Sequence, residues 1–198
     1  MEFFSNHIII ADAAYIDRMV FNLTVSFERM LGRRILSCDM ARWVECVALD
    51  GGIRGENNQI DVVLVHAPEM HQFNNFIPAG LQTELNGQAC GSTLGEFTFH
   101  TLTGAKMADS NEVLIDLAAT LSQDQQVKRL IIVPNGENSQ AMAQLKHHLM
   151  QAHPDQHITL LTMEPVAGGS FRQELLGYSL MQALGITAEE IESKLPRT

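Results

Sequence analysis

Three short runs rich in isoleucine, valine and leucine constrain the fold more than any other feature of the chain. They cover residues 7–11, 60–65 and 129–133. A strand with one face in water alternates apolar and polar residues, whereas a strand covered on both faces is apolar almost throughout. Sheets covered on both faces are mostly parallel, because the connecting helices pack on either side. These runs therefore predict the interior strands of a parallel sheet.

Segments with apolar residues at helical spacing separate these strands. The pattern predicts helices over residues 16–31, 111–122 and 139–152, and Gly32 stands where the first of them would need a C-cap. Residues 39–49 fit a helix or a strand, and we interpret them as a helix. The order strand, helix, strand is typical of parallel α/β units.

Further elements complete the predicted sheet. Residues 96–102 and 158–163 read as two more strands. Gly168-Gly169-Ser170 is predicted to open a helix that directs Phe171, Leu175, Leu176 and Leu180 towards the sheet. A last short helix is expected after residue 187, where Thr187-Ala188-Glu189-Glu190 resembles a capping box.

These elements predict an α/β fold with three layers, α/β/α, around a mainly parallel sheet of about five strands. We expect residues 1–198 to form a single domain. Residues 67–95 are rich in Asn, Gln, Gly and Pro and have little periodicity, which predicts a long loop or a small insertion.

Composition narrows the class of protein. No apolar run approaches the ~20 residues that a membrane-spanning helix needs. No basic residue precedes the first apolar run, so we expect no secretory signal, and the three cysteines fit reduced thiols in a cytoplasmic protein. The formal net charge of -10 argues against broad, non-specific binding to nucleic acid, which requires a basic face.

Polar residues follow the predicted strands, and this is where parallel α/β sheets bind ligands. The residues that the pattern brings to this edge are Asp12, His66, Glu112, Asn135, Glu137, Asn138, Glu164, Ser170 and Arg172. Converging carboxylates can hold a hard divalent cation, because such cations prefer oxygen ligands. A cation held in this way can activate water against a phosphodiester.

Three stretches of the sequence resemble the NYN branch of the PIN-like nuclease superfamily. Residues 9–16 (Ile-Ile-Ala-Asp12-Ala-Ala-Tyr-Ile) are similar to its first-strand motif. Residues 97–117 are similar to the strand, loop and helix that carry its second acidic residue. Residues 130–139 (Leu-Ile-Ile-Val-Pro-Asn-Gly-Glu-Asn-Ser) look like the strand that ends in its Ser-Gly-Asp-x-Asp-Phe signature.

The resemblance implies a PIN-like fold and, in active members, ribonuclease activity that depends on Mg²⁺ or Mn²⁺. Asp12 and Glu112 fall on two acidic positions of the family. The sequence departs from the family where Gly136 and Asn138 replace aspartates, and where Ala118 replaces another acidic residue and Tyr15 the usual asparagine. These departures predict a degenerate acidic site.

The first functional hypothesis is therefore a PIN-like domain that cleaves or binds RNA, or binds another phosphate-bearing ligand. Asp12 and Glu112 are its predicted catalytic residues and metal ligands, and Glu137 is a supplementary metal ligand, with Asp116 as an alternative. Its predicted substrate-binding residues are Asn135, Asn138, Ser170 and Arg172.

Each of these residues also has a purely structural interpretation. Asp12 could simply cap a helix, and Glu112 could simply favour the positive end of a helix dipole. Residues 135–138 are typical of a turn, and Gly168-Gly169-Ser170 of a plain connection.

Two other functions stay open. One is a non-catalytic scaffold or homo-oligomer that uses residues 67–95 or the C-terminal helices as its contact surface. The other is a small-molecule enzyme that uses His66 and the Gly-Gly-Ser turn.

Overall fold

The computed structural model describes residues 5–104 and 109–194, and within them seven strands form one sheet. These strands are β1 (His7–Asp12), β3 (Asn58–His66), β5 (Ala89–Ser92), β6 (Gly95–Thr103), β7 (Arg129–Val133), β8 (His157–Thr162) and β9 (Arg172–Leu175). Their order is β5-β6-β3-β1-β7-β8-β9. In this described part of the chain, neighbouring strands are parallel except β5 and β6, which are antiparallel. A small separate sheet pairs β2 (Cys38–Asp39) with β4 (Phe76–Ile77).

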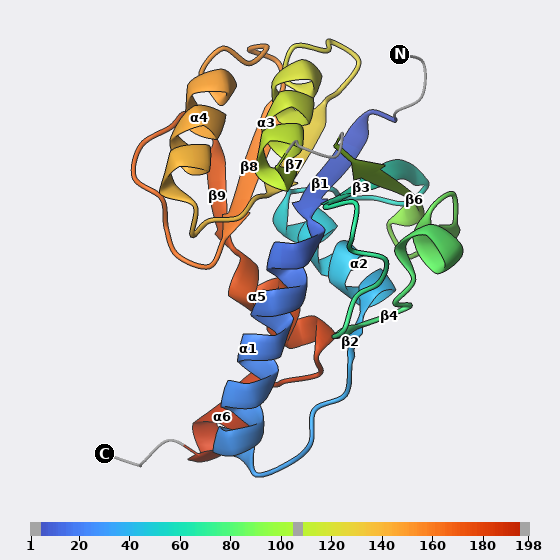
Figure 1. The fold of residues 1–198 in the computed structure, drawn as a ribbon, viewed down its shortest axis with the longest axis vertical. Coiled ribbons are helices and arrows are strands. Elements are labelled where there is room, and N and C mark those ends of the chain that lie inside the picture. The colour runs from blue at the N-terminus through green and yellow to red at the C-terminus, as the bar shows by residue number, and fades with distance from the viewer. Residues whose placement is uncertain (1–4, 105–108, 195–198) are drawn as a thin grey trace.

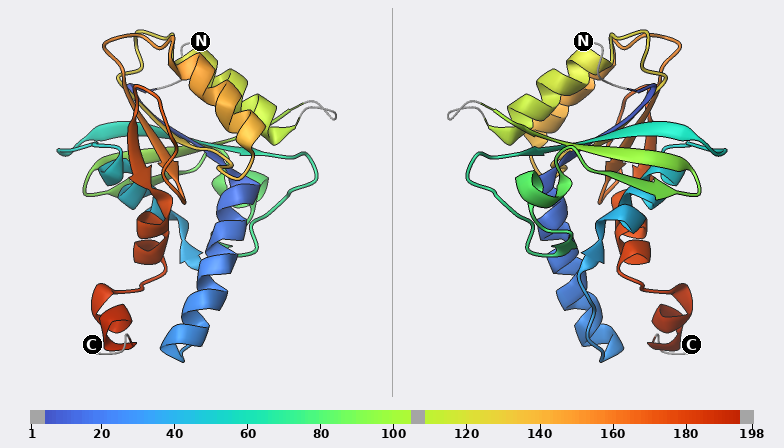
Figure 2. Two further views of the ribbon diagram at one scale, coloured as in Figure 1. Left: turned by 90° about the vertical axis from the view of Figure 1, so that its left-hand side faces the viewer. Right: turned by 90° about the vertical axis from the view of Figure 1, so that its right-hand side faces the viewer.

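Helices cover both faces of the sheet, so the protein has the predicted α/β/α layers (Figures 1 and 2). The helices are α1 (Ala13–Leu31), α2 (Met40–Asp50), α3 (Ser110–Leu121), α4 (Ser139–Leu149), α5 (Leu176–Ala183) and α6 (Ala188–Lys194). α1, α2 and α5 pack on one face, and α3 and α4 lie side by side on the other. α6 contacts α1. None of the described helices combines the length and apolar character that crossing a membrane requires.

The sequence of β1 explains its central position. Successive side chains of a strand point to opposite faces. Ile9 and Ala11 enter the core under α1, α2 and α5, whereas Ile8 and Ile10 enter the core under α3 and α4. All four are fully buried. The continuous apolar run is therefore the expected consequence of a strand with helices on both sides.

The strand order creates a switch point next to β1. The chain passes from β1 outward to β3 and β6, and then returns to β7 on the opposite side of β1. The connections that leave β1 and β7 therefore diverge towards different faces of the sheet. In open parallel sheets, ligands bind in the crevice that this divergence leaves beyond the carboxyl ends of the strands.

Helix boundaries confirm the predictions at Gly32 and at residues 187–190, and they show a further cap at Asn138. Gly32 ends α1 in the left-handed conformation, with a φ of 68°. The backbone N–H of Ala141 donates to the side chain of Asn138, which caps α4. Thr187 and Glu190 exchange two backbone-to-side-chain hydrogen bonds before α6, of 3.1 and 3.2 Å, which is a capping box.

The predicted number of strands was too low, and one predicted helix start was wrong. Residues 172–175 form β9, and α5 begins only at Leu176. This edge strand reads Arg-Gln-Glu-Leu, which contains no β-branched or aromatic residue, so it is defined by its pairing with β8 and not by propensity. Residues 67–95 include β4, a π-helical turn at Leu81–Leu85, and the antiparallel edge strand β5. Whether the sheet is specifically PIN-like stays a prediction.

Candidate site at the carboxyl edge of the sheet

Asp12 lies where β1 ends and α1 begins, at the switch point. Its side chain is 2% exposed and accepts hydrogen bonds from the Tyr15 backbone N–H at 2.8 Å and from the Ser110 hydroxyl at 3.4 Å, and the Ala14 backbone N–H also bonds to it. Burial raises the pKa of the Asp12 carboxyl above its ordinary value, and the nearby Asp109 carboxylate raises it further. Asp12 therefore caps a helix and is also a buried acid whose negative charge is only partly compensated.

Asp109 and Ser110 bring a second carboxylate to Asp12. Asp109 caps α3, and its Oδ1 atom lies 3.5 Å from the Ser110 hydroxyl oxygen. The hydroxyl has a single hydrogen, so it can donate to only one of the two carboxylates at a time. Two acidic side chains from different elements thus meet at one hydroxyl group.

Glu112 and Asp116 occupy a different side of the same helix. Both are exposed. Successive helical residues are about 100° apart, so Glu112 lies almost opposite Ser110 around α3. Of the acidic residues in this region, Asp109 is therefore the one that shares a hydroxyl with Asp12. Residues 105–108, which belong to the second stretch of the nuclease resemblance, lie outside the described residues.

Residues 135–138 form the turn between β7 and α4. The Glu137 backbone N–H donates to Asn135 Oδ1 at 3.2 Å, and the cap of α4 uses Asn138, so both amide side chains have structural tasks. Glu137 forms an exposed ion pair of 2.7 Å with Arg18 of α1. The Tyr15 hydroxyl lies close to this turn, because a Cβ atom on Gly136 would be 3.4 Å from it. Burial raises the pKa of Tyr15, which keeps this hydroxyl protonated.

Ser170 and Arg172 lie away from Asp12. They precede and begin β9, which is three strands from β1, about 14 Å across the sheet. The Arg172 guanidinium bonds to Glu174 and approaches Gly52, at the end of α2. Because residues 172–175 continue the sheet and do not open a helix, the Gly-Gly-Ser turn has no helix N-terminus next to it.

His66 ends β3, next to β1, and is 3% exposed. Its Nδ1 atom is 2.9 Å from the carbonyl oxygen of Ala67. Since a carbonyl only accepts, Nδ1 carries the hydrogen of this bond. Nε2 is buried and has no hydrogen-bond partner among the described residues.

A groove of about 710 Å³ runs beside this edge, between the start of α1 and residues 67–75. Ala14, Arg18 and Phe21 form one wall, and Met70 and Gln72 belong to the other. We call it the α1 groove.

The described residues contain no group of three or more His, Cys, Asp or Glu side chains arranged to share a metal ion. Among the described residues, Asp12 and Asp109 are the two carboxylates that meet at the Ser110 hydroxyl, and they would hold a cation there. Mg²⁺ in proteins is commonly held by one or two carboxylates, with water and substrate phosphate completing its shell. The donor set therefore fits a cation that binds together with a phosphate.

Asp109 is the functional candidate that the sequence interpretation missed. Its signal was local: Asp109-Ser-Asn-Glu112 has the spacing of a helix N-terminus, with an acidic cap followed three residues later by Glu. That pattern places Asp109 in the cap and Glu112 in the first turn.

Comparison with known proteins gives a family but no activity. No curated protein and no solved structure matches the chain. A family described as a family of unknown function (DUF6621) matches residues 2–191. This match covers almost the whole chain, and the protein belongs to the DUF6621 family.

Proposed function

We propose that this protein binds a phosphate-bearing ligand, such as a nucleotide, through a divalent cation, Mg²⁺ or Mn²⁺, held by Asp12 and Asp109. The observation that carries the proposal is the convergence of these two carboxylates on the Ser110 hydroxyl, at 3.4 and 3.5 Å, at the switch point of the sheet. Glu112, the second ligand expected from the sequence, is replaced by Asp109 in this proposal.

The charge of the site supports a bridging cation. Two neighbouring carboxylates in a chain of net charge -10 would repel a bare phosphate. A divalent cation between them cancels their two negative charges and leaves coordination positions that phosphate oxygens can take. It also favours the ionised form of Asp12, which burial disfavours.

Binding is better supported than hydrolysis. When bound, such a cation can polarise a phosphoryl oxygen and activate water. The third acidic side chain of this edge, Glu137, is exposed and already paired with Arg18. Asp12 and Asp109 can hold a phosphate through the cation, whereas the Tyr15 hydroxyl lies next to Gly136 in the 135–138 turn.

Calorimetric titration of Mn²⁺ in the presence of a ribonucleoside monophosphate tests this function. Asp12→Asn and Asp109→Asn remove one charge each but keep a good helix cap, so both variants should fold. We expect each to weaken Mn²⁺ binding by roughly tenfold or more, about 1.4 kcal/mol. The matched control is Glu112→Gln, which should change binding less than about twofold. Equal losses in all three variants, or no binding to the wild type, would refute the proposal.

A second candidate function is self-assembly through the α1 groove. Phe21 is 54% exposed at the mouth of this groove, and Val25, one helical turn further along α1, is exposed on the same side. Large exposed apolar side chains beside a groove are typical of protein interfaces. Light scattering over a range of concentrations tests this candidate. A dimer that Phe21→Glu converts to a monomer supports it, and a strictly monomeric wild type contradicts it.

A further inference from the structure

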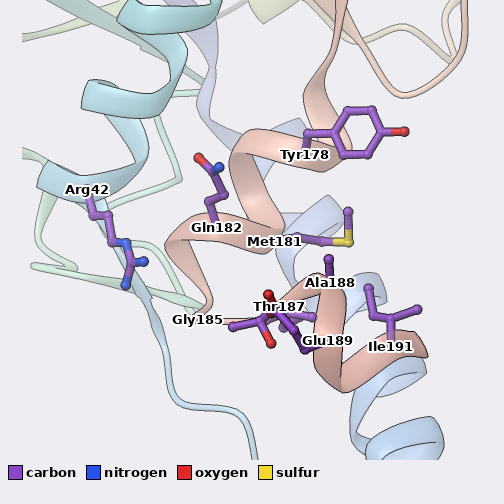
Figure 3. A pocket seen from close by; sticks show the side chains of 10 residues that line it. Arg42, Tyr178, Met181, Gln182, Gly185, Thr187, Ala188, Glu189 and Ile191 are labelled. Carbon is purple, nitrogen blue, oxygen red and sulfur yellow. The ribbon is translucent and has the colours of Figure 1, made fainter. Parts of the chain in front are cut away.

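A second cavity lies between the start of α2 and the helices α5 and α6, and it shares no lining residue with the α1 groove. Its volume is about 610 Å³, within the range of small-molecule sites. Figure 3 shows Arg42 reaching into it from α2, opposite side chains of α5 and α6. We call it the α5–α6 pocket.

One wall of the α5–α6 pocket is apolar. Met181, Ile186 and Ile191 line it, and each also packs against the larger hydrophobic core. Ala188 adds a small side chain to this wall, and Tyr178 stands at its outer end. The wall therefore offers a hydrocarbon chain a surface that is fixed by the core behind it.

Three other side chains of the pocket offer hydrogen-bond donors: Arg42 from α2, Gln182 from α5 and Thr187 before α6. Within residues 5–104 and 109–194, the Arg42 guanidinium forms neither a hydrogen bond nor an ion pair. Gln182 uses its Oε1 atom to accept from the Cys46 thiol at 3.2 Å, which leaves its NH₂ group available. The Thr187 hydroxyl oxygen accepts from the Glu190 backbone N–H, so its hydrogen is also free to donate.

Hydrogen bonds from Arg33 fix the position of α6 beside the pocket. Arg33 donates to both carboxylate oxygens of Glu190, at 2.7 and 2.9 Å, and to the Gly185 carbonyl oxygen at 3.1 Å. These bonds join the end of α1 to the turn between α5 and α6. The wall that carries Ala188 and Ile191 is therefore positioned by specific contacts.

We infer that the α5–α6 pocket binds a single-chain monocarboxylate, with its carboxylate on Arg42 and its alkyl chain along Met181, Ile186 and Ile191. Arginine is suited to this role because its planar donor group matches a carboxylate. Glu189 lines the pocket from α6, whereas Arg42 enters it from α2 (Figure 3), so the ligand's carboxylate is attracted to the Arg42 side and a second anionic group on the Glu189 side is disfavoured. The inference is independent of the cation site at the carboxyl edge.

Calorimetric titration with decanoate, kept below its micellar concentration, tests the inference on the full chain. Arg42→Met should weaken binding by roughly tenfold or more, because it removes the charged partner of the carboxylate. Arg34→Met is the matched control: it removes the same charge from an exposed arginine that does not line the pocket, and should leave the affinity within about twofold. Decan-1-ol should bind the wild type more weakly than decanoate does.

A second variant tests the apolar wall. Ala188 is exposed on α6, so Ala188→Trp can fill the pocket without disturbing the core, and it should abolish decanoate binding. Failure of the wild type to bind decanoate overturns the inference. So do equal affinities of Arg42→Met and Arg34→Met, or unchanged binding by Ala188→Trp. Thermal unfolding of each variant shows that a loss of binding is not a loss of fold.

Discussion

Two buried aspartates near the start of α1 have opposite surroundings. Asp17 is 6% exposed and accepts from the backbone N–H groups of Asn74 and Asn75, at 2.9 to 3.2 Å. The Asn74 side chain gives it a further hydrogen bond of 3.3 Å. Asp12 is as deeply buried, but beside the backbone N–H groups of Tyr15 and Ala14 it has a long bond from a hydroxyl that also faces Asp109.

The difference separates structure from candidate function. Asp17 fixes residues 74–75 against α1 and so builds the α1 groove, in which it takes part as a wall. The negative charge of Asp12 is only partly compensated, because burial raises its pKa and a second acid lies close to it. Perturbed acids of this kind are concentrated at binding and catalytic sites, whereas acids satisfied by backbone amides mainly stabilise the fold.

The largest effect is expected from Asp17→Asn. The variant removes the charge that the amides of residues 74 and 75 bind, and turns an NH₂ group towards donors. We expect the free energy of unfolding to fall by about 2 kcal/mol or more, measured by urea denaturation. The control is Asp116→Asn on the exposed side of α3, which should have almost no effect. If Asp17→Asn is as stable as this control, the role assigned to Asp17 is wrong.

Asp12→Asn should have a smaller effect on the free energy of unfolding, and the effect should have the opposite sign. Because the folded state holds the Asp12 proton to higher pH than the unfolded state does, the wild type should lose stability as the pH rises through the folded pKa. Asp12→Asn still caps α1, but asparagine does not titrate, so the variant should not lose stability in this way. Denaturation between about pH 4 and pH 8 should show the variant gaining on the wild type as the pH rises. A loss of stability of Asp12→Asn relative to the wild type as the pH rises would contradict a raised pKa of Asp12.

The smallest change in the free energy of unfolding is expected at the exposed Glu137–Arg18 ion pair. Glu137→Gln breaks an ion pair with Arg18 in which both side chains are largely exposed. Such pairs contribute little, so the free energy of unfolding should change by less than about 0.5 kcal/mol. Arg18→Met also removes the guanidinium from the Tyr15 ring, 5.5 Å from its centroid, so its loss in the same measurement should be at least as large. A loss of stability several times larger would mean that the Glu137–Arg18 pair, and not Asp17, fixes the loops at the carboxyl edge.

Local chemistry explains which parts of the fold could be predicted. The interior strands follow from continuous apolar runs, because a strand between two helical layers has no polar face. Asp12, Gly32 and Asn138 were predictable at helix ends because a cap is defined by a few neighbouring residues.

The remaining parts depend on distant contacts. β9 exists because β8 offers a free edge, and this moved Arg172 from the predicted helix start into the sheet. At α3, the actual start at Ser110 gives Asp109 the cap and leaves Glu112 exposed on the other side. Helix boundaries of this kind shift by one or two residues, and such a shift decides which carboxylate reaches Asp12.

The most direct test is the titration of the Asp12 carboxyl carbon by NMR, with and without Mg²⁺ and a ribonucleoside monophosphate. The account predicts a pKa above the ordinary value in the free protein, which Asp109→Asn lowers and which Mg²⁺ with the nucleotide also lowers. Glu112→Gln should leave it unchanged. An Asp12 pKa at or below the ordinary value, insensitive both to Asp109 and to Mg²⁺, would contradict the central claim that these two aspartates share a cation site.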